Sequence, residues 1–179
     1  ADVAPDTVHP RLWRLSQLNA IHGLFEVVPG VYQVRGFALA NITFIEGTTG
    51  VIVVDPLGSV ESAKAALDLY HAHRPKRPVT AVIYTHSHSD HYGGARGVAD
   101  PLEVAAGRTA VIAPAGFMAA VVAESVVAGN AMSRRAAELF TLPRSQRLER
   151  MDGHRQGDAV GLLREDTGEV RVPRVRVDD

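Results

Sequence analysis

The sequence predicts an α+β fold in which a sheet sandwich is covered by helices, and three observations support this. Short apolar stretches separated by turn residues fill residues 25–56, which is typical of antiparallel hairpins. From residue 59 onward, helix and strand patterns alternate. Three histidines and an aspartate lie within residues 86–91, directly after an apolar run. The sequence therefore predicts a sheet with helices outside it and a polar loop after one strand.

The composition is that of a globular domain with a real core. The chain has 179 residues, of which 46% are hydrophobic and 22% charged. Its net charge of −1 gives no reason to expect a nucleic-acid partner or an anionic membrane surface. No apolar run approaches the ~20 residues of a membrane span. Cysteine is absent, so any metal must be bound by histidine and carboxylate.

The first elements in chain order are a covering segment and four strands. Leu12, Trp13, Leu15 and Leu18 are spaced to cover a neighbouring surface. Strands are expected at residues 25–28, 31–36, 41–47 and 51–56.

Strand and helix patterns then alternate. Ser59 is placed to cap an amphipathic helix over 59–73, and the β-branched residues of 79–85 predict a buried strand. After the histidine loop we expect a helix from Gly94, a strand at 109–114, and helices at 115–129 and 130–140.

Residues 141–179 differ from the rest of the chain in amino-acid composition. They contain no Phe, Trp or Tyr, yet hold eight of the seventeen arginines. We therefore expect a domain over residues 1–140 and an atypical tail over 141–179. The tail is either a solvated extension or a stretch altered by truncation or a shifted reading frame, and its composition favours the second.

The spacing of the histidine loop predicts a metal site. In an extended chain, His86 and His88 point to the same side, so both can reach one ion. Asp90 and His91 lie at the turn into the next element and can face a second ion. Three imidazoles and a carboxylate suit Zn²⁺, and two ions roughly 3.5–4 Å apart can share a hydroxide.

The alternative is a polar surface loop with incidental histidines. The neighbouring sequence argues against it, because the motif follows an apolar strand pattern and precedes Gly93 and Gly94. We expect these glycines where the backbone passes close to the ligands. By contrast, His71 and His73 repeat the H-x-H spacing at a helix end, where imidazole interacts well with the helix dipole.

The segment THSHSDHYGG (residues 85–94) resembles the H-x-H-x-D-H signature of the metallo-β-lactamase superfamily. The resemblance implies a metallo-β-lactamase-like αββα four-layer sandwich with metals at one edge of its sheets, of which this chain would hold only the N-terminal half. Asp55 matches the strand-end aspartate that supports the metal loop there. A turn residue leading into a helix is the alternative for Asp55.

Within that superfamily, the chain resembles the zinc-dependent alkyl sulfatases. The likeness runs from about residue 9 to Phe140, and its most specific part outside the metal loop is AGNAMSRRA (residues 128–136). It implies hydrolysis of sulfate monoesters by metal-bound hydroxide, with two zinc ions at His86, His88, Asp90 and His91. Members of this family are several times longer and dimerise through a later region.

Several parts of the predicted site stay open. Two zinc ions need more than four protein ligands. The only later histidine, His154, is expected to be an exposed loop residue rather than a ligand. Arg134 and Arg135 could bind a sulfate, although a charged helix face is the alternative. No acid for the leaving group is identifiable.

The function predicted from the sequence is a zinc-dependent hydrolase of small-molecule alkyl sulfates. Two alternatives remain: another hydrolase of the superfamily, such as a thioesterase or lactonase, or a truncated, non-catalytic fragment of a sulfatase. The compartment is not predicted, and a periplasmic or secreted location is expected only if a signal segment preceding Ala1 was removed.

Overall fold

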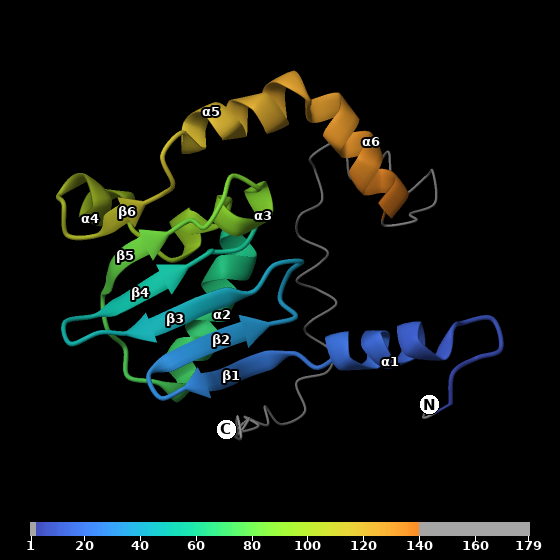
Figure 1. Ribbon diagram of the computed structural model, residues 1–179. Helices are drawn as coiled ribbons and strands as arrows, with labels where there is room; N and C mark the ends of the chain where they lie inside the picture. The colour runs from blue at the N-terminus through green and yellow to red at the C-terminus, as the bar shows by residue number, and fades with distance from the viewer. Residues whose placement is uncertain (1–2, 140–179) are drawn as a thin grey trace.

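The computed structural model describes residues 3–139, which form one six-stranded sheet with surrounding helices (Figure 1). The strands lie side by side in chain order. They are β1 (Gly23–Val28), β2 (Val31–Arg35), β3 (Ile42–Glu46), β4 (Val51–Val54), β5 (Val79–Ile83) and β6 (Ala110–Ile112). The helices are α1 (Pro10–Asn19), α2 (Val60–His73), α3 (Ser89–Tyr92), α4 (Pro101–Ala105), α5 (Phe117–Val122) and α6 (Gly129–Leu139), with a 3₁₀ turn η1 (Ala95–Gly97) and a π-helical turn η2 (Ala123–Val127).

The sheet changes from antiparallel to parallel at β4. Strands β1 to β4 pair antiparallel through short turns, as the hairpin pattern predicts. Strand β5 pairs parallel to β4, and β6 pairs parallel to β5. A parallel pair needs a crossover, which α2 provides. The carboxyl ends of β4 and β5 therefore lie at the same edge of the sheet, where open α/β sheets bind their ligands.

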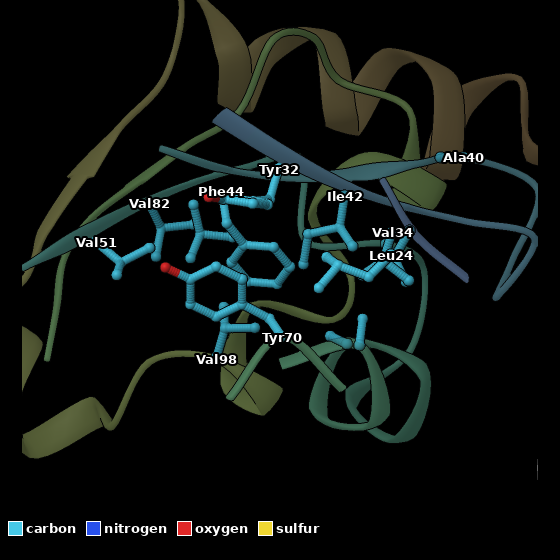
Figure 2. Close-up of a cluster of buried hydrophobic side chains, with 14 residues drawn as sticks. Leu24, Tyr32, Val34, Ala40, Ile42, Phe44, Val51, Tyr70, Val82 and Val98 are labelled. Atoms are coloured by element: carbon cyan, nitrogen blue, oxygen red, sulfur yellow. The ribbon is translucent and has the colours of Figure 1, made fainter. Parts of the chain in front are cut away.

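Helix α2 closes the core on one face of the sheet. Ser59 caps it as predicted, by accepting a hydrogen bond from the Ser62 amide. The ring of Tyr70 stacks on Phe44, with ring centroids 4.5 Å apart. Figure 2 shows these rings at the centre of a cluster drawn from the strands and α2. Fully burying an aromatic or branched side chain of this kind contributes about 1.5–3 kcal/mol.

Two expectations about single elements are wrong in part. The leucines of α1 are 43–59% exposed, and Figure 1 shows this helix extending away from the amino end of β1 instead of covering the sheet. The strand expected over 79–85 ends at Ile83, and within it only Val82 is fully buried. The remaining positions of β5 are half-buried because α2 packs on one face only.

The continuous helix expected from Gly94 is also absent. Short turns take its place: α3 begins inside the histidine motif, and η1 and α4 follow it. The reason lies in Asp100 and Pro101, because the Asp100 side chain caps the amide of Leu102 and starts a new helix at the proline.

The described residues thus form an α+β unit with one sheet, and none of their helices is both long and apolar enough to cross a bilayer. The expected tail, residues 141–179, and His154 lie outside the described residues.

Candidate metal centre

The turn after β4 holds Asp55 in an unusual backbone conformation. Asp55 has a φ angle of 52° and Leu57 one of 60°, and residues other than glycine rarely adopt this backbone conformation. Such strain persists only where the surroundings fix it. Here Leu57 is fully buried, and its carbonyl accepts a hydrogen bond from the amide of Gly94. The turn is therefore fixed against the segment that carries the histidines.

Gly93 and Gly94 explain how closely the two segments approach. A Cβ on Gly94 would collide with the carbonyl oxygens of Pro56 and Ser59, and one on Gly93 would collide with that of Gly58. The glycines were expected where the backbone passes close to the ligands. The backbone that passes there is that of the Asp55 turn, so the glycines bring that turn against the motif.

The Asp55 carboxylate joins the turn to the histidine loop. It accepts hydrogen bonds from the amide of Thr85 (2.8 Å) and from the Thr85 hydroxyl (2.7 Å). It also lies 2.8 Å from Nδ1 of His91, which donates to it. Asp55 is 9% exposed, so these donors satisfy a nearly buried charge.

Each of the three histidines in the motif has one ring nitrogen directed at a protein group. His91 donates from Nδ1 to Asp55. The Thr85 hydroxyl gives its hydrogen to Asp55, so it accepts from Nδ1 of His86, 2.9 Å away. Nε2 of His88 lies 3.4 Å from an oxygen of Glu124. With the proton of each ring on the nitrogen that faces the protein, the opposite nitrogen carries a lone pair that can bind a cation.

The opposite nitrogens face one another and the remaining carboxylate. Nε2 of His86 lies 3.1 Å from Nδ1 of His88, and Nε2 of His91 lies 3.5 Å from Oδ2 of Asp90. Two ring nitrogens without protons repel at such a distance unless a cation lies between them. The donor set therefore fits a metal ion.

Asp55 also lies near this group, since one ligand atom each of Asp55, His86 and His91 fall within 4.8 Å of one another. The Oδ2 atom of Asp55 already accepts from Thr85 and His91, however. This arrangement suits a residue that orients His91, and among residues 3–139 no donor hydrogen-bonds to the carboxylate of Asp90, which is therefore the better metal ligand.

Glu124 is the residue of this cluster that sequence reasoning missed. It lies in η2, and it also accepts a hydrogen bond from the hydroxyl of Ser87 at 3.1 Å. The segment that contains Glu124 resembles alkyl sulfatases, but no spacing rule connects a helical glutamate to a loop 37 residues earlier.

The two arginines considered for sulfate binding lie on α6. The side chains of Arg134 and Arg135 are exposed, and in the described part of the chain neither is hydrogen-bonded to the histidine motif.

His71 departs from the role expected at a helix end. Its Nε2 is buried without a hydrogen-bond partner among the described residues. Burial, together with the positive charge of Lys76, lowers the pKa of His71. Desolvation thus outweighs the favourable helix end for His71, whereas His73 is exposed.

The chain matches the family model of the metallo-beta-lactamase superfamily over residues 35–171. It is 60% identical to a linear primary-alkylsulfatase of Pseudomonas sp. over 139 residues, and 55% identical to the alkyl/aryl-sulfatase BDS1 of Saccharomyces cerevisiae over 135 residues. These matches cover 78% and 75% of this chain but only 21% of either relative.

The chain is also similar to a solved structure of an alkylsulfatase. The structure of the stereoselective inverting sec-alkylsulfatase Pisa1 from Pseudomonas sp. matches with a TM-score of 0.70 and 57% identity, over 75% of this chain and 21% of that one. The chain therefore spans about a fifth of the length of these relatives. At this identity, the likeness extends to the fold and to the arrangement of its strands and helices.

Proposed function

Since the chain belongs to the metallo-beta-lactamase superfamily, we propose that it is part of a zinc-dependent hydrolase of alkyl sulfate esters. The observation that carries this proposal is the 55–60% identity, over about three-quarters of the chain, to proteins named as alkylsulfatases. The geometry of the site by itself supports a metal centre, and the relatives supply the sulfate ester as the substrate.

The residues of the motif would divide between two zinc ions. His86 and His88 would hold one ion through Nε2 and Nδ1, the two nitrogens that face each other. Asp90 and Nε2 of His91 would hold the other. Asp55 would orient His91 from the side opposite the metal. Bound zinc supplies a Lewis acid that activates water and neutralises charge on the ester oxygens.

The chain's own residues supply the frame around these ions. The fixed Asp55 turn and the glycine pair set the positions of the ligands before a metal binds. Arg134 and Arg135 are candidates to bind the sulfate group, and small alkyl sulfates rather than nucleic acids are the expected partners. The acid that protonates the leaving group is not among the residues assigned here.

The proposal is tested in two steps with the purified 179-residue chain. Zinc binding is measured first by titration calorimetry. We expect binding that falls more than about 100-fold in His88→Ala, a larger loss than outer-sphere changes cause. His73→Ala, which removes an exposed histidine outside the motif, is the matched control and is expected to bind zinc normally.

Inorganic sulfate released from dodecyl sulfate by the zinc-loaded chain is measured second. Release that stops with a chelator and in His88→Ala supports the sulfatase. Hydrolysis of a thioester or lactone without sulfate release would favour the other hydrolases of the superfamily. Zinc binding without any hydrolysis would favour the truncated, non-catalytic alternative, and a folded chain that binds no zinc would contradict the metal centre itself.

A further inference from the structure

Glu124 contacts two consecutive residues of the histidine loop from a separate helical segment. Its Oε2 atom accepts a hydrogen bond from the hydroxyl of Ser87 (3.1 Å), and Oε1 lies 3.4 Å from Nε2 of His88. In Figure 1 the segment from α5 to α6 passes above the loop that contains α3. The glutamate is thus positioned by one element and acts on another.

The contact falls on the ring nitrogen of His88 that does not face His86. A carboxylate beside Nε2 retains the proton there and leaves Nδ1 free to bind a cation. The same carboxylate makes the ring a more basic ligand. This pattern matches His91, which donates from Nδ1 to Asp55 while its Nε2 faces Asp90.

The local backbone supports a specific role for this side chain. Glu124 lies in the π-helical turn η2, and such single turns often occur at functional sites. The neighbouring Val126 and Val127 are 73% and 82% exposed. Among the described residues, burial of the turn's apolar side chains therefore does not account for its position, whereas the contacts of Glu124 tie it to the loop.

We infer that Glu124 is a positioning residue that orients His88 for metal binding. The inference rests on the proposed metal centre, and it adds a residue outside the H-x-H-x-D-H motif. Glu124 touches the ligand and not the metal, so its removal is expected to lower the affinity for zinc without changing the number of ions bound.

The experiment compares Glu124→Ala with Glu103→Ala in the 179-residue chain. Glu103 is the matched control, because it forms an ion pair with Arg108 and has a similar exposure (43% against 37%). Zinc affinity is measured by competition with a chelator, and the ligand field by the absorption of bound Co²⁺. We expect Glu124→Ala to lose about 10- to 100-fold in affinity with a shifted Co²⁺ spectrum. Glu103→Ala is expected to match the wild-type chain.

Two further variants separate positioning from a general structural role. Glu124→Gln retains an acceptor oxygen, so it is expected to lose less than about 10-fold. In a His88→Ala background, Glu124→Ala is expected to cause no additional loss, because its effect acts through His88. Thermal unfolding of the metal-free variants shows that each one folds.

The inference is overturned if Glu124→Ala binds zinc as the wild type does, if its loss persists in the His88→Ala background, or if it binds fewer ions. These results differ from failure of the proposed metal centre, in which the wild-type chain itself binds no zinc.

Discussion

The two ends of α2 lie beside two polar clusters that differ in one respect. At the carboxyl end, Glu46 accepts two hydrogen bonds from Arg74, both 2.8 Å long, and one from the hydroxyl of Tyr70. At the amino end, α2 packs against the segment of the histidine motif, where Nε2 of His86 and Nδ1 of His88 lie 3.1 Å apart. The first cluster joins a carboxylate to a cation and a hydroxyl donor, whereas the second brings together ring nitrogens that can bind a cation.

In the first cluster, Glu46 and Tyr70 are joined by a hydrogen bond, and the pKa values of both are shifted. The hydrogen bonds from Arg74 hold the pKa of Glu46 below its usual value, although burial acts in the opposite direction. Burial and the neighbouring Glu46 raise the pKa of Tyr70. Every charge there has a partner, which is what stability requires of polar groups beside a core. A cluster that leaves its lone pairs facing each other is instead arranged for a ligand.

The largest expected effect comes from removing one member of each cluster in the metal-free chain. Glu46→Ala leaves Arg74 unpaired and the hydroxyl of Tyr70 without its acceptor, so we expect the free energy of unfolding to fall by about 3 kcal/mol. His86→Ala removes one hydrogen bond, to the hydroxyl of the exposed Thr85, and is expected to cost no more than about 1 kcal/mol. Urea denaturation measures both. Equal losses would remove the distinction between the clusters.

A smaller effect is expected from the contact that joins the Asp55 turn to the motif. Gly94→Ala forces a methyl group against the carbonyls of Pro56 and Ser59, which we expect to cost about 2 kcal/mol and to weaken zinc binding. Gly129→Ala is the control, because a Cβ there meets open space. Denaturation and zinc titration of both variants check this, and unchanged zinc affinity in Gly94→Ala would show that the turn does not position the ligands.

The smallest effect is expected from His71, which lies in the last turn of α2 beside Tyr70 of the first cluster. Because burial lowers its pKa, the unfolded chain binds a proton more readily than the folded one. The contribution of neutral His71 to the free energy of unfolding is therefore complete above the ordinary histidine pKa of about 6.5. It is lost as the pH falls toward the lowered pKa of His71 in the folded chain.

Unfolding measured between pH 8 and pH 5 tests this. We expect the free energy of unfolding to fall less on acidification in His71→Leu than in the wild type. In His73→Leu the fall is expected to match the wild type, because the side chain of His73 is exposed. Identical pH profiles in all three proteins would contradict the prediction.

The sheet could be predicted because its signals are local. The turns at Pro29–Gly30 and around Gly50 and the cap at Ser59 each act within a few residues. The structure confirms the strands on either side of these turns and the helix that begins after Ser59. The predictions for α1 and for the segment after Gly94 were less successful. Apolar spacing cannot show whether a partner surface lies nearby, and the new helix start at Pro101 interrupts the expected pattern.

By itself, the sequence determined the hairpins, the helix crossover and the H-x-H-x-D-H loop, because each depends on neighbours along the chain. The tertiary structure alone decided which nitrogen of each histidine faces the protein, since Asp55 and Glu124 reach His91 and His88 from other segments, and Asp55 also holds the Thr85 hydroxyl that contacts His86. It also showed that Gly93 and Gly94 accommodate the Asp55 turn. Contacts between distant segments depend on how the sheet and its helices pack, and residue spacing does not record that packing.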